Sequence, residues 1–230
     1  MIFISPPFGN YIGTPYTTSI RGSFTLKKRP GLFGQIYRTL YYSKINGGWI
    51  NKIGLRNRGI DYALKCYKYD KNSIYSIAIL ENNEVEEFVK KIPVEMNLEI
   101  NLSCPNTDKE MIREDIHLFL NNKRKYCIVK LSPLESKGNI DKLYRMGFRQ
   151  FHCSNTLPTH NGGLSGRKLI PYTYRLINII KKYPDCEIIA GGGIDSHEIL
   201  HKYKQFGAHH FSISTIFFNP YRTFKFFINL

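Results

Sequence analysis

Eight short apolar runs, separated by longer amphipathic stretches, constrain the fold of this chain more than any other feature. Each run has the length of a β-strand, and most stretches between them repeat apolar residues at the spacing of a helix. This alternation is typical of parallel strands joined by helices. The runs are residues 2–5, 19–25, 73–80, 94–103, 126–132, 150–155, 187–191 and 210–215.

The helix-like stretches fill most intervals between the runs, and Ser196 precedes the last of them as a candidate N-cap. Because the strands follow one another without a repeat or a linker, the sequence predicts one compact α/β domain over residues 1–230. The expected fold is a (β/α)8 TIM barrel with its chemistry at the carboxyl ends of the strands. An open doubly wound sheet is the alternative. The expected helices are residues 61–67, 84–91, 109–120, 139–146, 172–183 and 196–206.

Two segments depart from this pattern. The interval between the first two runs is short and contains Gly13 and Pro15, so we expect the barrel to lack its first helix. Residues 27–51 contain Pro30 and paired glycines at Gly47 and Gly48. We therefore expect a long irregular loop there, which in a compact domain usually serves function.

The charge of the chain has two interpretations. Lys and Arg number 33 against 18 Asp and Glu, which gives a net charge of +15. Such an excess suits a polyanion such as nucleic acid. The basic residues are spread along the whole length, however, which favours a solvated surface with no specific nucleic-acid partner.

Cysteine usage and the amino terminus indicate the compartment. The cysteines are odd in number and none forms a C-x-x-C pair, which argues against a disulfide framework, a zinc ribbon or another metal site. No apolar run is long enough to span a membrane, and the first residues lack the pattern of a signal peptide. We expect a cytoplasmic protein with reduced thiols at Cys66, Cys104, Cys127, Cys153 and Cys186.

The run at residues 94–103 alternates polar and apolar side chains. Asn97, Glu99 and Asn101 share one face, and polar groups that face into a barrel need partners, which a bound polar cofactor would supply. Cys104 follows at the end of this strand, before Pro105, where a barrel places catalytic groups. A catalytic thiol is the favoured interpretation, and an inert buried thiol is the alternative.

Two further strand ends predict a phosphate site. Three successive glycines, Gly191 to Gly193, end the seventh run before a helix, so that the backbone could approach an anion closely. Ser214 and Thr215 end the neighbouring eighth run, and barrels commonly hold phosphate at this position. Lys130 lies inside the fifth run, where a buried ammonium needs an anionic partner, either a ligand or Glu99.

These motifs resemble those of the dihydroorotate dehydrogenase family. Asn-Leu-Ser-Cys-Pro-Asn at residues 101–106, Val-Lys-Leu-Ser-Pro at 129–133 and Ser-Asn-Thr at 154–156 occur in the family's order. The same holds for the Gly-Gly-Leu-Ser-Gly-Arg-Lys-Leu stretch at 162–169 and the glycine turn at 191–194. Residues 22–27 and 50–59 look like its second strand and substrate loop, so the resemblance covers residues 22–217.

The resemblance implies an FMN enzyme that oxidises dihydroorotate to orotate in de novo pyrimidine synthesis, an oxidoreductase acting on a CH–CH bond. It implies that Cys104 removes a proton from C5 and that Lys130 lies beside flavin N1 and O2. The implied substrate contacts are Asn51, Gly54, Leu55, Asn101, Asn106, Asn155 and Thr156. The implied FMN contacts are Ser23, Asn101, Lys130, Ser154, Gly166, Gly192, Gly193, Ser214 and Thr215.

Several alternatives stay open. A tRNA dihydrouridine synthase is also an FMN barrel with a cysteine before proline, although it has glycine where this chain has Ser103; a non-catalytic flavoprotein is a further alternative. A cysteine base resembles the soluble class of the family, whereas residues 22–25 and 162–169 look like the membrane class. The electron acceptor (fumarate, quinone, or NAD through a partner protein) and a homodimeric assembly therefore remain open.

Overall fold

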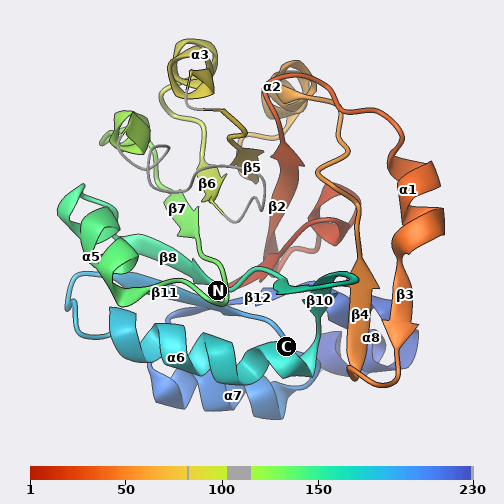
Figure 1. Ribbon diagram of the computed structural model, residues 1–230. Coiled ribbons are helices and arrows are strands. Elements are labelled where there is room, and N and C mark those ends of the chain that lie inside the picture. The colour runs from red at the N-terminus through yellow and green to blue at the C-terminus, as the bar shows by residue number, and fades with distance from the viewer. Residues whose placement is uncertain (82, 103–114, 229–230) are drawn as a thin grey trace.

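The computed structural model describes residues 1–81, 83–102 and 115–228. Eight parallel strands close into a barrel in the order β1-β12-β11-β8-β7-β6-β5-β2 (Figure 1). Each strand coincides with or overlaps one of the eight predicted runs, which confirms the predicted barrel. The strands are β1 (Ile2–Ile4), β2 (Thr17–Phe24), β5 (Ile74–Ala78), β6 (Leu98–Asn101), β7 (Cys127–Lys130), β8 (Gln150–Cys153), β11 (Glu187–Gly191) and β12 (His210–Ile213).

Helices surround the barrel on its outer face (Figure 1). The Ser196 hydroxyl accepts a hydrogen bond from the Ile199 N–H at 3.5 Å. Ser196 therefore caps the amino end of α7, the helix that follows the seventh barrel strand, as predicted. Only a 3-10 helix, η1 (Phe8–Asn10), joins β1 to β2, which confirms the missing first helix. The first half of the predicted helix 109–120 lies outside the described residues, and its second half contains η2 (Ile116–Phe119). The α-helices that the structure describes outside residues 27–51 are α2 (Ile60–Tyr69), α3 (Glu84–Lys91), α5 (Lys137–Arg145), α6 (Ile170–Ile180), α7 (His197–Phe206) and α8 (Pro220–Phe227).

The prediction of an irregular loop at residues 27–51 is wrong. This segment forms α1 (Leu32–Thr39), β3 (Tyr41–Ser43) and β4 (Gly48–Asn51). The two strands join β9 (Leu157–Thr159) and β10 (Gly162–Ser165) in a second, antiparallel sheet of order β3-β4-β10-β9.

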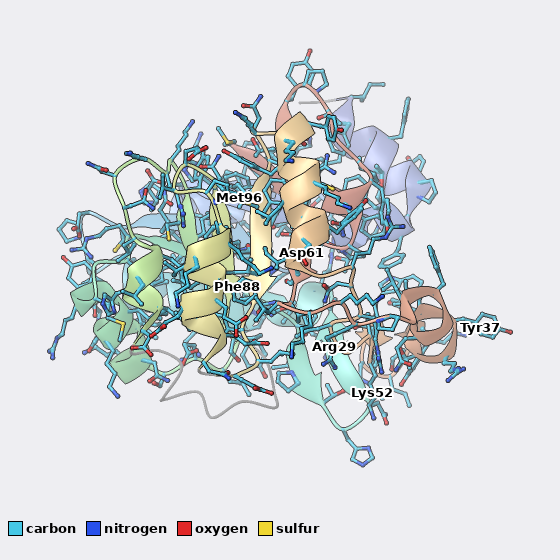
Figure 2. All side chains as sticks on the ribbon, turned by 90° about the horizontal axis from the view of Figure 1, so that it is seen from above. Arg29, Tyr37, Lys52, Asp61, Phe88 and Met96 are labelled. Carbon is cyan, nitrogen blue, oxygen red and sulfur yellow. The ribbon has the colours of Figure 1, made fainter. Side chains whose placement is uncertain are left out.

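The glycines of this segment mark a tight turn and a close approach rather than irregular chain. Gly47 has a φ of 61° in the β3–β4 turn. A Cβ on Gly48 would lie 2.3 Å from the Ser165 carbonyl oxygen. Trp49 stacks on Phe218 with ring centroids 4.2 Å apart and anchors the hairpin to η4 (Thr215–Phe218). Figure 2 shows Tyr37 of α1 pointing outward at the edge of the molecule.

The barrel interior changes from apolar to polar along the strands. One layer, near the amino ends, contains Phe3, Ile20, Ile74, Tyr126, Ile128 and Ile189 as a separate apolar cluster. Towards the carboxyl ends the inward positions are polar, among them Ser76, Glu99, Lys130, His152 and Ser212, all buried. On β6 the outward residues Leu98 and Ile100 belong to the core beneath the helices, which confirms the predicted alternation.

No helix within the described ranges is both long and apolar enough to cross a bilayer.

Candidate active site

A cavity opens at the carboxyl ends of β8, β11 and β12. About 510 Å³ of space lies between its walls, part of it open to solvent. The structure thus brings together residues from strand ends far apart in the sequence. The predicted site residues that line the cavity are Lys130, Ser154, Asn155, Thr156, Gly166, Gly192, Gly193, Ser214 and Thr215.

The glycine turn after β11 forms one wall of this cavity. Gly192 and Gly193 have φ values of 83° and 78°, in the left-handed region that favours glycine. A Cβ on Gly193 would lie 2.9 Å from the Cα of Arg167, so the chain that follows Gly166 packs directly on the turn. The Tyr203 hydroxyl donates to the Gly192 carbonyl at 2.8 Å and fixes the turn from below.

The backbone donors at this wall suit an anion. The N–H groups of Gly193, Ser214 and Thr215, which lie beyond the strand ends, donate to no backbone carbonyl within the part of the chain that the structure describes. Helix α7 starts a few residues after Gly193, so the partial positive charge of its amino end adds to these donors. Unpartnered N–H groups beside a helix start are a recurrent way to bind phosphate.

Three buried titratable side chains form the floor of the cavity. Lys130 and His152 line it, and Glu99 lies beneath them with no exposed surface. Glu99 Oε2 is 2.6 Å from His152 Nδ1, and its Oε1 is 3.7 Å from Lys130 Nζ. The sequence therefore pointed correctly to Glu99 as one anionic partner of Lys130.

The ionisation states of this cluster follow from its charges. Burial alone would raise the pKa of Glu99, but the charge of Lys130 and the contact with His152 outweigh it and hold that pKa at about 2. Burial and the charge of Lys130 lower the pKa of His152 more than Glu99 raises it. Near neutral pH Glu99 is therefore a carboxylate and His152 is a neutral imidazole.

A chain of hydrogen bonds connects the predicted polar residues of three strand ends. Asn155 Nδ2 donates to Asn101 Oδ1 at 3.0 Å, and Asn101 Nδ2 donates to Ser23 Oγ at 3.1 Å. The Thr156 N–H donates to Asn155 Oδ1 at 2.9 Å and so fixes the orientation of that amide. Asn101 and Ser23 lie outside the cavity lining but reach it through Asn155. Ser154 Oγ lies 3.4 Å from Thr173 Oγ1.

The predicted substrate loop, residues 50–59, starts in β4 of the second sheet, continues beyond that strand, and lies outside the cavity lining. Asn51 pairs with Gly163, whose added Cβ would lie 2.5 Å from Thr156 Oγ1, so the predicted residues Asn51 and Thr156 flank the same glycine. Gly54 and Leu55 follow in a turn with φ values of 64° and 54°. A left-handed leucine is strained by roughly 1–2 kcal/mol, and such strain often accompanies function.

The predicted base Cys104 and the predicted ligand Asn106 lie outside the described residues. The cysteines within the described ranges are free thiols. Burial raises the pKa of Cys127 and of Cys186 to about 11, and it raises the pKa of Cys153 further. These three thiols stay protonated near neutral pH, so none of them is suited to act as a base.

Sequence reasoning did not single out His152. The signal was present in the strand period, because His152 lies two residues before Ser154 and so shares its inward face. The partner Glu99 is 53 residues away along the chain, and nothing local in the sequence announces the contact.

Comparisons with known proteins identify the family to which this chain is similar. The family model described as dihydroorotate dehydrogenase matches residues 16–228. The catalytic subunit of dihydroorotate dehydrogenase B (NAD(+)) from Anoxybacillus flavithermus is 28% identical, over 93% of this chain and 80% of the relative. The same subunit from Malacoplasma penetrans is 27% identical, over 93% and 81%.

Solved structures share the fold. Ligand-free DHODH from Eimeria tenella superposes with a TM-score of 0.72 at 19% identity, covering 99% of this chain and 83% of that one. The DHODH from the same organism in complex with ferulenol gives 0.67 at 20% identity, covering 86% and 70%. Because the family model spans nearly all of the described chain, this protein belongs to the dihydroorotate dehydrogenase family.

Proposed function

We propose that the protein binds one FMN in the cavity and uses it to oxidise dihydroorotate to orotate, a step of pyrimidine synthesis. The observation that carries this proposal is the cavity itself. Three residues that line it, Gly193, Ser214 and Thr215, have backbone N–H groups without carbonyl partners, and Lys130 lines its floor. Family membership supplies the class of reaction, an oxidation at a CH–CH bond.

The residues present fit FMN in their chemistry. The donors at Gly193, Ser214 and Thr215 suit the phosphate, and Gly192 beside them adds no side-chain bulk that would keep a phosphate away. Lys130 suits the pyrimidine end of the flavin, where negative charge gathers when the ring accepts a hydride. Asn101 and Ser23 offer amide and hydroxyl groups at the neighbouring strand ends.

The side chains of this protein would then divide the work. Asn155, Asn101 and Asn51 would hold the carboxylate and ring amides of the substrate, because an asparagine presents a donor and an acceptor together. Cys104 would remove the C5 proton, and FMN bound in the cavity would supply the acceptor for the hydride that leaves C6. Lys130 would stabilise the charge that develops on reduction, and the barrel around it would exclude water from that charge.

The test is anaerobic addition of dihydroorotate to protein that has been loaded with FMN. We expect one FMN per chain, loss of the oxidised flavin absorbance, and release of one orotate per flavin. Protein that retains no FMN, or a bound flavin that dihydroorotate leaves oxidised, would contradict the proposal. Arg145→Ala, at an exposed position on α5 outside the cavity lining, is the matched control and should leave both results unchanged.

The acceptor of the electrons is a separate question. The two relatives above are named as NAD(+)-dependent catalytic subunits. Reoxidation of the reduced protein by fumarate, by a quinone, or by NAD with and without a flavoprotein partner would discriminate between the acceptors.

A further inference from the structure

The buried cluster of Glu99, Lys130 and His152 contains two opposite charges that cancel. Glu99 and His152 are at most 1% exposed, and Lys130 is 8% exposed. Glu99 is a carboxylate, Lys130 an ammonium and His152 a neutral ring, so the cluster carries no net charge. Its carboxylate already neutralises the lysine that would face a bound flavin.

Lys130 and Glu99 supply the charges that act on His152 from the surrounding strands. Lys130 comes from β7 and Glu99 from β6. From β11 the ring meets Gly191, where an added Cβ would lie 2.8 Å from His152 Nε2. Next to β1 and β12 the cavity is lined by Ser5 and Ser212. Their hydroxyls lie 2.5 Å apart and are uncharged.

The two nitrogens of His152 have different surroundings. Nδ1 is 2.6 Å from Glu99 Oε2, so in the neutral ring Nδ1 carries the hydrogen and donates it to the carboxylate. Nε2 is then the basic nitrogen, on a ring that lines the cavity. A second proton on this ring would keep the Nδ1–H bond to Glu99, which is a geometry that stabilises an imidazolium.

We propose that His152 takes up a proton at Nε2 when the bound flavin is reduced, and that Glu99 positions His152 and Lys130 for this change. The proposal rests on the proposed function, because it requires a flavin over Lys130. A hydride would bring two electrons and one proton to the flavin, and the flavin would then carry one added negative charge. His152 takes one proton from solvent through the cavity and returns it when the flavin is reoxidised.

The physical reason is the low polarity of the site. A negative charge placed over a neutral cluster in a poorly solvated cavity is costly. Lys130 alone stabilises that charge only in part, because the Glu99 carboxylate already neutralises much of the lysine's charge. Negative charge within a few ångströms raises the pKa of a histidine. Burial and Lys130 hold the pKa of His152 below its ordinary value in the oxidised protein, so the added negative charge must carry that pKa past neutral pH.

The experiment reads the charge of His152 directly. Protein labelled with ¹⁵N-histidine and loaded with FMN is examined by NMR near pH 7, about half a unit above the ordinary histidine pKa, before and after reduction by dithionite. Dithionite supplies the electrons, so the result does not depend on turnover. We expect His152 as the neutral Nδ1–H form in the oxidised protein and as the imidazolium in the reduced protein.

Variants assign the signal and test the role of Glu99. His152→Asn removes the signal, and His152→Gln serves if the first variant does not fold. Glu99→Gln removes the charge that stabilises the imidazolium, so His152 should stay neutral in both redox states. His160→Asn is the matched control, because His160 is exposed on the β9–β10 turn and its signal should not change on reduction.

The outcomes separate this proposal from the proposed function. Absence of bound FMN overturns both. Bound FMN with His152 neutral in both redox states, or charged in both, overturns only the proton uptake. An imidazolium that still forms in Glu99→Gln overturns the positioning role of Glu99.

Discussion

Asn155 donates to Asn101 at 3.0 Å and so connects the carboxyl ends of β8 and β6 across the intervening strand β7. The Thr156 N–H bond to the same amide leaves Asn155 one orientation. Both asparagines are predicted to bind substrate, so each one holds the other in place for that contact.

Asn155→Ala should therefore weaken orotate binding. A hydrogen bond to a buried group is worth roughly 1.5 kcal/mol, which corresponds to about tenfold in the dissociation constant. Titration of FMN-loaded protein with orotate measures the change. Asn178→Ala, at an exposed position on α6, should leave affinity as it was. Equal affinities in the two variants would remove Asn155 from the substrate site.

Thr173 connects helix α6 to the glycine turn. Its side chain is fully buried, and its hydroxyl donates to the Gly191 carbonyl at 2.8 Å. Thr173→Val keeps the shape of the side chain but leaves that carbonyl without this donor, at a cost of about 1–3 kcal/mol. We expect a lower free energy of unfolding in urea and weaker retention of FMN. Unchanged retention would mean that the turn holds its form without this bond.

Gly193 tests the phosphate wall. Its positive φ strains any other residue, and an added Cβ would lie 2.8 Å from Ile170 Cγ1. Gly193→Ala should abolish or strongly reduce FMN binding, measured by fluorescence titration. Gly138→Ala is the matched control on α5, where nothing lies within 4 Å of an added Cβ. That control should bind FMN normally and gain about 0.5–1 kcal/mol of stability. Equal FMN affinity in both variants would place the phosphate elsewhere.

Glu99 should make stability depend on acid pH. Its pKa falls from an ordinary 4.5 to about 2 in the folded protein. The stabilisation is fully present above about pH 4.5 and is lost as pH falls through the folded value, because the unfolded state then binds the proton first. Two to three units correspond to on the order of 3 kcal/mol.

Urea unfolding from about pH 2 to about pH 7 measures this dependence. Glu99→Gln should be less stable than the wild type at neutral pH and should show a flatter profile in the acid range. Parallel profiles for the two proteins would show that the ionisation of Glu99 does not contribute to folding.

The barrel could be predicted from the sequence because each strand carries its own signal, a short apolar run between helical stretches. The second sheet could not, since β4 pairs with β10 and Ile50 meets Leu164 far along the chain. Of the paired glycines that suggest a loop there, Gly47 is required by the tight β3–β4 turn and Gly48 by the close approach to Ser165. The sequence could place four residues of the cavity lining together, because the strand ends of a barrel converge. These residues are Gly192, Gly193, Ser214 and Thr215. The contact of His152 with Glu99 has no local pattern and emerges only from the closed barrel.

The rate of flavin reduction by dihydroorotate tests whether Cys104 is the base in the proposed oxidation. Anaerobic single-turnover mixing of FMN-loaded wild type and Cys104→Ala with dihydroorotate gives that rate. Because an ordinary thiol has a pKa of about 8.5, the wild-type rate should rise as pH increases through that region. The alanine variant should keep its FMN and bind orotate, yet be slower by about 10² to 10⁴. An alanine variant reduced as fast as the wild type would contradict the account.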